Sequence, residues 1–469
     1  MKLYNTLSRQ VEEVRPLKEG EISLYTCGLT VYSQPHIGNW VAYIYWDVLQ
    51  RALQAEGYKV KRVQNITDVG HLTSDEDAGE DKMLKSALSE GTTAWEVADK
   101  YIDIANHEAY ELLGLQKPEY LPRATDYIDQ QIEFVKQLEE KGYTYTIADG
   151  VYFDTGKLDD YGKLAKLDLK GLRFGARVAD TGKKNPTDFA LWKFSPENEK
   201  RDMEWDSPWG KGFPGWHLEC SCIAREILGD QIDIHTGGID HIPVHHTNEI
   251  AQTEALTGKK FANIWVHANH IKVNGTKMSK SLGNIYTLKD ITDKGFDIQA
   301  FKLMILSKHY RTEGNFTWEN LEASQNLLNN LRRFADLLWE LPDTSSTEFS
   351  FLNGISSNIK KSFNNDLDSP QALMHLSSAE NQWIRVLSTE SKKSFKDFLV
   401  MIDDMLGLNL STTRDITDEQ YGILEEREAA RKSQDWIKSD RLRDELKAQG
   451  IGLRDTEKAI KHGAIWYRI

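Results

Sequence analysis

Two short segments of the chain contain residue types that proteins use to handle phosphate groups. The first is His36-Ile37-Gly38-Asn39, and the second is Lys277-Met278-Ser279-Lys280-Ser281. Imidazole and ammonium groups donate hydrogen bonds to phosphate oxygens, and glycine lets a nucleotide approach the backbone closely. The two lysines can neutralise the charge that develops on a pentavalent α-phosphate and on departing pyrophosphate, and Lys280 is our first choice for that role. Either segment alone is weak, but together, in this order, they indicate ATP.

The pattern around the first segment predicts a strand, a loop, a helix and a second strand. Residues 22–27 are typical of a buried strand, and a loop containing Gly28 follows. Apolar residues then recur at helical spacing from Val41 to Ala52, and residues 59–65 alternate like a strand. His36 and Gly38 therefore lie near a predicted helix N-terminus, where free N–H groups and the helix dipole favour phosphate.

A metal site can be considered from the chemistry of the side chains alone. Three cysteines in 469 residues do not form a disulfide framework. His245 and Glu249 are four residues apart in a segment that the pattern predicts to be helical as far as Gly258, so both side chains share one face. Two cysteines, a histidine and a carboxylate are a plausible zinc set. Spacing alone leaves an alternative open. In it, each cysteine is a small buried hydrophobic residue, and His245 and Glu249 form an ordinary surface contact.

Together with further segments, these features show that the chain resembles class I aminoacyl-tRNA synthetases, and specifically cysteinyl-tRNA synthetases, over essentially its full length. The segments that carry the resemblance are Tyr4-Asn5-Thr6-Leu7, Tyr25-Thr26-Cys27-Gly28-Leu29-Thr30-Val31-Tyr32, Asn65-Ile66-Thr67-Asp68, Pro214-Gly215-Trp216-His217-Leu218-Glu219-Cys220-Ser221 and His245-His246-Thr247-Asn248-Glu249-Ile250-Ala251-Gln252. The resemblance implies an α/β fold: a Rossmann-like parallel-sheet catalytic domain with an insertion, an α-helical bundle and a small C-terminal domain.

The resemblance also implies one zinc ion per chain, bound by Cys27, Cys220, His245 and Glu249. In the family this metal binds the sulfur of the substrate. Cysteine and serine are nearly isosteric, so a pocket that reads shape separates them poorly, whereas a thiolate is a far better zinc ligand than an alcohol. Cys222 has no role in the family, and we expect it to be structural.

Other site residues follow from the same resemblance. The catalytic set is His36, Asn39, Lys277 and Lys280, and ATP, with Mg2+, is expected to contact His36, Gly38, Asn39, Asp240 and Lys280. Trp216 and Thr67 are implied to line the amino-acid pocket. The ordinary alternative for Trp216 is core packing, and for Thr67 it is a hydroxyl at the end of a strand. His235 and His267 either face the pocket or are satisfied buried histidines.

The chain departs from the family at three places. Asn39 replaces the usual last histidine of the first segment, and its neutral amide still donates a hydrogen bond, so we expect activity to survive. Val69-Gly70-His71-Leu72 and the acidic stretch 74–82 replace the usual continuation after Asp68. We expect a solvated loop there, with substrate contact by His71 as the alternative. Pro243-Val244 is the third departure, and we expect it to change only the packing.

Composition limits the remaining possibilities. A net charge of −14 argues against indiscriminate nucleic-acid binding but allows one folded RNA to dock on a local basic surface. Residues 427–469 contain eleven Lys/Arg and seven Asp/Glu, an excess of four positive charges. No apolar run is long enough for a membrane span, and no signal segment is recognised at Met1-Lys2-Leu3, so a cytoplasmic location is expected.

Changes of pattern along the chain predict three domains. They are residues 1–306 with an insertion at about 121–213, residues 307–412 and residues 413–469. The resemblance implies that these are a Rossmann-like catalytic domain, a helical bundle that binds tRNA and a C-terminal anticodon-recognition domain. An apolar stripe from Leu327 to Leu338 supports the bundle. In the last domain Arg431, Trp436, Asp440 and Asp455 match the family's anticodon-reading positions, whereas alone they would be taken for a surface helix with salt bridges.

The resulting hypothesis is ATP-dependent ligation of L-cysteine to tRNA-Cys through cysteinyl-adenylate. The expected partners are L-cysteine, ATP and tRNA-Cys, with no membrane, and we expect a monomer. One alternative is a ligase of the mycothiol-pathway type, which transfers cysteine to a sugar amine; the long C-terminal portion counts against it. Another is a non-catalytic paralogue that binds tRNA or senses cysteine, against which the intact lysine segment and the complete ligand set count.

Overall fold

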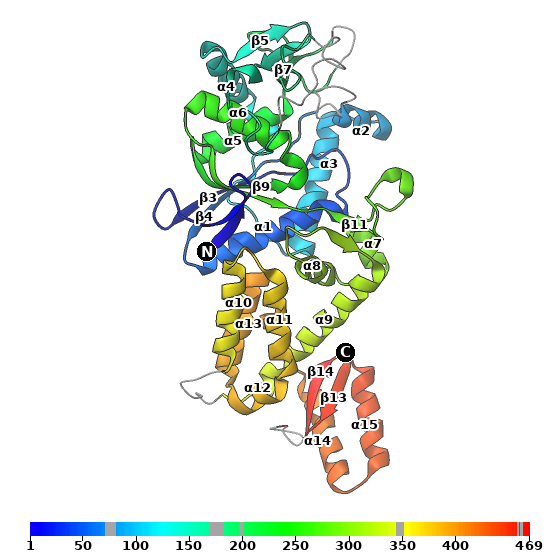
Figure 1. Ribbon diagram of the computed structural model, residues 1–469. Helices are drawn as coiled ribbons and strands as arrows, with labels where there is room; N and C mark the ends of the chain where they lie inside the picture. Colours follow the sequence, from blue (N-terminus) through cyan, green and yellow to red (C-terminus); the bar gives the residue numbers. More distant parts are fainter. Residues whose placement is uncertain (71–80, 168–181, 197–200, 344–350, 457–458, 460–462) are drawn as a thin grey trace. The chain divides into compact units, whose positions relative to one another are not determined.

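The computed structural model describes residues 1–70, 81–167, 182–196, 201–343, 351–456, 459 and 463–469, with the side chain of Lys280 outside the description. The chain forms two compact units (Figure 1). The first unit comprises 1–272, 276–288 and 310–314, and the second comprises 273–275, 289–309 and 315–469. Each is described separately below.

A four-stranded parallel sheet lies at the centre of the first unit. Its strands are β3 (Glu21–Thr26), β4 (Lys59–Gln64), β9 (Ile232–Gly238) and β10 (Ala262–Ala268), in the order β10-β9-β3-β4. Helices α1 (Ile37–Ala55) and α6 (His245–Thr257) connect β3 to β4 and β9 to β10. The connections leave the β3–β9 pair in opposite directions, so the strand order reverses there. Ligands bind such sheets outside the carboxyl ends of the strands at this point.

Helix α1 forms because its apolar residues recur at the spacing of one helical face. Trp40, Ile44 and Val48 are at most 1% exposed. The helix ends before Gly57, which has a φ of 91° that L-residues rarely adopt. The predicted strand, helix and second strand are therefore present, with the helix beginning four residues before the first periodic position, Val41.

An antiparallel sheet lies between the two halves of the parallel sheet in sequence. Its strands, in the order β5-β6-β7-β8, are β5 (Thr144–Ile147), β6 (Gly150–Phe153), β7 (Phe189–Phe194) and β8 (Gly212–Pro214). Phe153 and Phe189 stack with their ring centroids 5.1 Å apart. They share a core with Leu218 and Cys222 of α5 (Trp216–Leu228), so this sheet packs on the helix that carries Cys220. Cys222 is 1% exposed in that core, in keeping with a structural role.

The remaining elements of the first unit lie around these two sheets. They are β1 (Lys2–Asn5), β2 (Gln10–Glu13), α2 (Lys82–Glu90), α3 (Ala94–Asn106), η1 (His107–Leu112), η2 (Ala124–Tyr127), α4 (Ile128–Glu140), η3 (Thr155–Lys157), η5 (Ile239–His241) and η6 (Lys280–Leu282). Two short strands, β11 (Ile271–Val273) and β12 (Gly314–Phe316), form a separate two-stranded sheet. Within the acidic stretch 74–82, Asp81 caps α2 by accepting from the backbone N–H groups of Met83 and Leu84. The predictions for His71 and for 74–80 lie outside the described residues.

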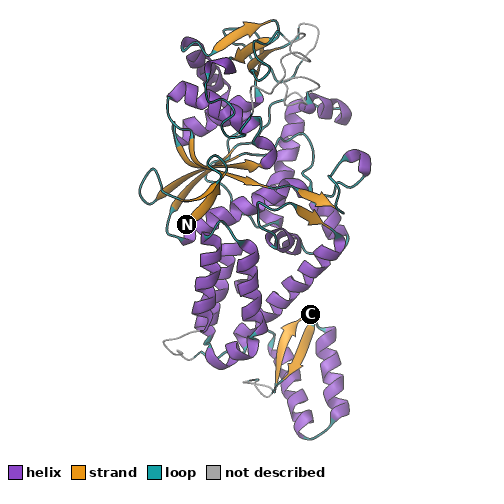
Figure 2. Cartoon of the chain, viewed as in Figure 1, coloured by secondary structure: helices purple, strands orange, loops and turns teal. Residues whose placement is uncertain are grey.

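The second unit is helical from Trp318 onward in its described residues, apart from a hairpin near the C-terminus (Figure 2). Its helices are α7 (Leu288–Asp293), α8 (Ile298–Leu306), α9 (Trp318–Asp336), η7 (Leu337–Trp339), α10 (Phe351–Asn364), α11 (Ser369–Asn381), α12 (Trp383–Thr389), α13 (Lys392–Leu406), η8 (Leu410–Thr412), α14 (Asp418–Lys432) and α15 (Trp436–Ala448). Phe334 of the predicted stripe packs edge-on against Phe395 of α13, with the centroids 5.1 Å apart.

The hairpin pairs β13 (Ile451–Asp455) with β14 (Ala464–Arg468) in antiparallel register. Arg468 attaches it to α9, because its Nη1 lies 2.5 Å from Oδ1 of the buried Asp336 and its backbone N–H donates to Oδ2 at 2.9 Å. Among the described residues, no helix combines the length and hydrophobicity that a membrane crossing requires. The predicted α/β class with a Rossmann-like parallel sheet and a helical region after it is confirmed.

Candidate active site and metal centre

Four predicted metal ligands come together at the carboxyl end of the parallel sheet. Cys27 follows β3, Cys220 lies on α5, and His245 and Glu249 lie on the first turns of α6. One ligand atom from each lies within 4.8 Å of the others. Each of the four side chains is at most 8% exposed. Residues separated by more than two hundred positions in the sequence thus form one compact donor set.

The first turn of α6 fixes the charged part of this set. His245 Nε2 lies 3.0 Å from Glu249 Oε1, as the four-residue spacing predicts. Burial acts to raise the pKa of Glu249, but His235 and His245 outweigh it and lower that pKa to about 2. For His245, burial acts to lower the pKa, but the charges and hydrogen bonds of Glu249 and Cys220 outweigh this effect. The pKa of His245 therefore lies well above its usual value. The carboxylate is therefore ionised throughout the neutral range.

The two thiols are protonated in the metal-free protein. Burial raises the pKa of Cys27 to about 11 and raises that of Cys220 well above its usual value. A divalent cation reverses this preference, because it stabilises the thiolate that burial disfavours. Two thiolates, one imidazole and one carboxylate fit the coordination chemistry of Zn2+.

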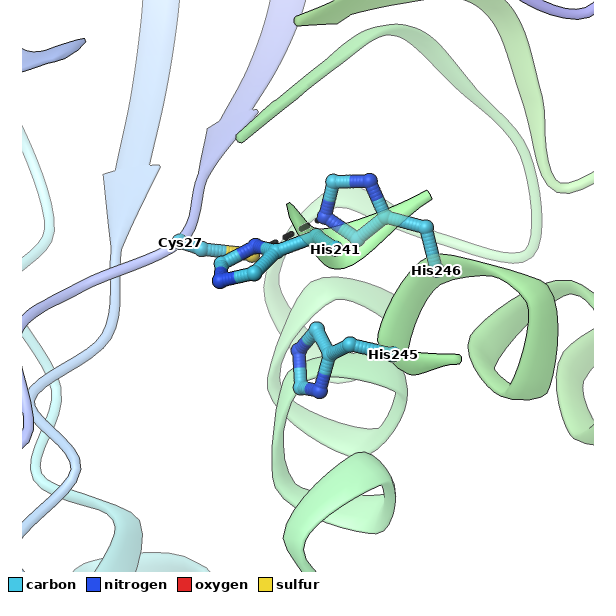
Figure 3. Close-up of side chains that lie close together, drawn as sticks. All are labelled: Cys27, His241, His245 and His246. Atoms are coloured by element: carbon cyan, nitrogen blue, oxygen red, sulfur yellow. Dashed lines mark hydrogen bonds between the residues drawn. The ribbon is translucent and has the colours of Figure 1, made fainter. Parts of the chain in front are cut away.

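Two further groups of side chains overlap with this set. One consists of Cys27, His241, His245 and His246 (Figure 3), and the other of Cys27, His235, His246 and Glu249. Figure 3 shows His245 and His246 projecting from the start of α6, with a hydrogen bond of 3.3 Å between Cys27 Sγ and His246 Nε2. Chemistry favours the predicted set, since it alone provides two sulfur ligands to a borderline-soft cation.

Several histidines surround the donor set and hold it in place. His235 Nε2 lies 2.9 Å from Glu249 Oε2, His217 Nδ1 lies 3.0 Å from His245 Nδ1, and His246 Nδ1 lies 2.7 Å from His267 Nε2. Burial lowers the pKa of both His246 and His267 well below the usual value. Hydrogen bonds of this kind orient metal ligands. The sequence identified His235 and His267 as buried or pocket residues but gave no sign of these pairings.

The two segments that are predicted to bind phosphate are neighbours in the first unit. His36 is the N-cap of α1, and the Ile37 N–H donates to the Tyr286 carbonyl at 2.8 Å. A Cβ on Gly38 would lie 2.2 Å from Cε of Met278, so a side chain at position 38 would displace this methionine. The glycine therefore permits the close approach of the lysine segment to the start of α1.

Asn284 organises the lysine segment. Its Oδ1 accepts the Ser279 N–H at 2.8 Å, and its Nδ2 donates to the Lys277 carbonyl at 3.1 Å and to Thr276 Oγ1 at 3.2 Å. Lys277 is exposed. Sequence reasoning missed Asn284, because an asparagine just after a glycine is also an ordinary turn signal.

Asn39 has a structural task at the position where the family usually has histidine. Its Oδ1 accepts the His36 backbone N–H at 2.9 Å, which satisfies a donor at the beginning of α1. We expect Asn39→Ala to lower the free energy of unfolding by about 1 kcal/mol in urea titrations, as loss of a cap does. Gln54→Ala, at an exposed position of the same helix, is the control and is expected to change it by less than about 0.5 kcal/mol. Equal effects of the two would show that the cap is unimportant.

The other predicted pocket residues lie close to the donor set. The Trp216 ring centroid lies 4.7 Å from that of His245. The Thr67 carbonyl accepts the N–H of Val31, and the Thr67 N–H donates to the carbonyl of Leu29. Leu29 lies two residues after Cys27. Asp240 is exposed on η5, directly after β9.

The predicted RNA-contacting residues form a second cluster, in the C-terminal part of the second unit. Arg431 lies 6.0 Å from the centroid of the Trp436 ring, which is 56% exposed. The Asp455 carboxylate binds Arg431 at 3.2 Å, and also Arg427 and Arg443, both at 2.8 Å. Arg443 lies 3.8 Å from Asp440. Asp440 and Asp455 thus contact two arginines, Arg427 and Arg443, that sequence reasoning did not single out.

Comparison with solved structures defines the class of this fold. A Mycobacterium tuberculosis methionyl-tRNA synthetase bound by methionyl-adenylate aligns with a TM-score of 0.60 at 14% identity, covering 83% of this chain and 92% of that one. The LeuRS-tRNA-LeuAMS ternary complex from Agrobacterium radiobacter K84 aligns with a TM-score of 0.62 at 12% identity, covering 86% of each chain. The fold is that of class I aminoacyl-tRNA synthetases.

Sequence comparison defines the family within that class. Residues 13–326 match the tRNA synthetases class I (C) catalytic domain, and residues 413–461 match the cysteinyl-tRNA ligase anticodon binding domain. Cysteine–tRNA ligase 1 of Burkholderia lata is 44% identical over 97% of this chain and 95% of its own length. Cysteine–tRNA ligase of Treponema denticola is 39% identical over 97% of this chain and 98% of its own length. The chain belongs to the cysteinyl-tRNA ligase family of class I aminoacyl-tRNA synthetases.

Proposed function

We propose that this enzyme joins L-cysteine to tRNA-Cys in two steps. The cysteine carboxylate attacks the α-phosphorus of ATP, which forms cysteinyl-adenylate and releases pyrophosphate. A hydroxyl of the terminal adenosine of tRNA-Cys then attacks the activated carbonyl, which releases AMP. No residue need act as a covalent nucleophile, because positioning and charge stabilisation supply the catalysis.

The observation that carries this proposal is the buried set of Cys27, Cys220, His245 and Glu249. When bound there, Zn2+ would supply a soft ligand site for the thiol of the substrate. The four side chains would hold the ion, and the surrounding histidines would fix their orientation. Serine has no soft donor, so the site rejects it without needing a separate hydrolytic site.

The residues around α1 and the lysine segment are assigned to ATP. His36 and Gly38 lie at the helix N-terminus, which favours phosphate, and Lys277 and Lys280 neutralise the charge that develops as pyrophosphate leaves. Asn39 acts through the cap of α1, and Asp240 is assigned to the ribose hydroxyls. Mg2+ accompanies ATP. The contact between Gly38 and Met278 supports this grouping, since it brings both segments to one place.

Zinc affinity is expected to rise steeply with pH. The pKa of Cys27 is raised to about 11 and that of Cys220 lies well above its usual value, so both thiols hold protons at neutral pH and must release them on binding. His245, whose pKa also lies well above its usual value, must release a third proton, so three displaced protons give an increase of about 1000-fold in apparent affinity per pH unit between pH 6.5 and 8. Calorimetry in buffers of different ionisation enthalpy counts these protons directly. Binding without proton release would contradict the assignment of the thiols.

The C-terminal cluster is assigned to the anticodon, with Trp436 as the stacking platform. We expect Trp436→Ala to raise the KM for tRNA-Cys about 10-fold, because stacking a base on an aromatic side chain contributes about 1–3 kcal/mol. Pyrophosphate exchange, which requires no tRNA, is expected to stay unchanged. An unchanged KM for tRNA-Cys would remove Trp436 from the RNA surface.

The direct test of the function is cysteine-dependent exchange of pyrophosphate into ATP, followed by charging of tRNA-Cys. We expect activity with cysteine and none with serine. The match of residues 413–461 to an anticodon binding domain argues against transfer to a sugar amine. Exchange without charging of any tRNA would favour that alternative, and absence of exchange would favour a non-catalytic paralogue.

A further inference from the structure

A buried carboxylate beside the metal ligands has no place in the function described so far. Glu219 directly precedes Cys220 on α5 and is 0% exposed. Its Oε1 accepts hydrogen bonds from the Thr67 hydroxyl and, at 3.1 Å, from Asn65 Nδ2, and it lies 4.0 Å from Cys220 Sγ. Removing a carboxylate from water is costly, so a carboxylate at this position calls for a reason.

The hydrogen bonds of Glu219 fix the direction of one hydroxyl. Thr67 has a single O–H donor, and it is directed at Glu219. Asn65 Nδ2 donates to Thr67 Oγ1 at 3.0 Å, so this oxygen acts as an acceptor toward its other neighbours. The Thr67 hydroxyl is therefore set to receive a hydrogen bond, with a negative charge directly behind it.

The same network reaches the other side of the donor set. Asn65 Oδ1 accepts the N–H of Gly28 at 2.8 Å, and Gly28 follows Cys27. A Cβ on Gly28 would lie 1.5 Å from the Asn65 carbonyl oxygen, so only glycine fits this close approach. The network is thus connected to both predicted cysteine ligands. It reaches Cys27 through Asn65 and Gly28, and it reaches Cys220 because Glu219 is its neighbour on α5.

We infer that Glu219 positions Thr67 to bind the α-ammonium group of the amino-acid substrate and supplies the negative charge that this cation requires. This inference rests on the proposed function and deepens it. In cysteine, three bonds separate the sulfur from the amino nitrogen, and Cys220 Sγ lies only 4.0 Å from the Glu219 carboxylate. The ammonium donates to Thr67 Oγ1, and Thr67 donates to Glu219. Glu219 is a positioning residue that acts through Thr67.

Three thiols that differ in their charged groups test this inference. Cysteine has both an ammonium and a carboxylate, cysteamine has only the ammonium, and 3-mercaptopropionate has only the carboxylate. In zinc-loaded Glu219→Gln, we expect the affinities for cysteine and cysteamine to fall about 10-fold and the affinity for 3-mercaptopropionate to fall less than about 3-fold, as loss of a charged hydrogen-bond partner predicts. Equal losses for all three thiols, or no loss, would overturn the inference.

Two controls separate recognition from folding. Asp233→Asn removes another buried carboxylate, which accepts from Ser23 and Leu17, and we expect it to leave the ratio of the three affinities unchanged. If Glu219→Gln does not fold, Thr67→Val is expected to give the same selective loss, and Thr67→Ser to retain the wild-type ratio. Thr67→Val with the wild-type ratio would overturn the inference. If the wild-type protein binds none of the thiols when zinc-loaded, the proposed function fails as well.

Discussion

Replacing Lys280 by alanine is expected to slow cysteine-dependent pyrophosphate exchange by about 10³-fold, since removing one charge-stabilising donor from a transition state typically costs about 10²- to 10³-fold and an ammonium carries full charge. The KM for cysteine is expected to change little, because the proposed role of the lysine is to act on the phosphates. Pre-steady-state formation of the adenylate measures the effect without interference from tRNA.

The control for this prediction is a lysine outside the segment. Lys289 is exposed and pairs with Asp293 at 2.6 Å, so Lys289→Ala is expected to leave exchange unchanged. Lys280→Ala is expected to unfold at the same urea concentration as the wild type. Unchanged exchange in Lys280→Ala would remove this residue from catalysis and transfer the role to Lys277.

Replacing Cys220 by serine is expected to abolish zinc retention and to lower cysteine-dependent exchange by about 10³-fold or more. An alcohol stays protonated at neutral pH and binds zinc far more weakly than a thiolate, so the set loses one of its two soft ligands. Metal analysis of the purified variant and its exchange rate at saturating cysteine are the two measurements.

Cys222 provides a matched control on the same helix. It is as buried as Cys220, at 1% exposure, but it packs among apolar side chains in the core shared with the antiparallel sheet. Cys222→Ser is expected to cost stability, because it buries a hydroxyl, and to retain one zinc ion per chain. Loss of zinc from Cys222→Ser, or its retention by Cys220→Ser, would contradict the ligand assignment.

Local periodicity in the sequence was sufficient to predict the elements that begin the parallel sheet. These elements are the strand before Cys27, helix α1 and strand β4. Apolar residues repeat every 3.6 positions on the buried face of a helix and every 2.0 positions on the buried face of a strand, and both patterns can be read from the sequence. The helical start of α6 and its termination near Gly258 were predicted on the same grounds. The boundaries proposed for the three domains remain predictions.

The site itself depends on contacts that no local pattern encodes. The resemblance to a family supplied Cys27, Cys220, His245 and Glu249, but the pairing of His235 with Glu249 follows from the way α6 folds back on β9. Glu219 was missed for a related reason: its hydrogen bonds join residues more than 150 positions apart in the sequence. The bonds of Asn284 are local, and it was missed because an asparagine after a glycine is an ordinary turn signal. A buried glutamate next to a cysteine reads in the sequence as an ordinary helical residue.

One measurement tests the central claim most directly: the zinc content of the purified protein together with its discrimination between cysteine and serine in pyrophosphate exchange, before and after removal of the metal. We expect one zinc ion per chain, a preference for cysteine of at least about 10⁴-fold, and loss of that preference with the metal. Metal-free protein that still activates cysteine and rejects serine would contradict the claim.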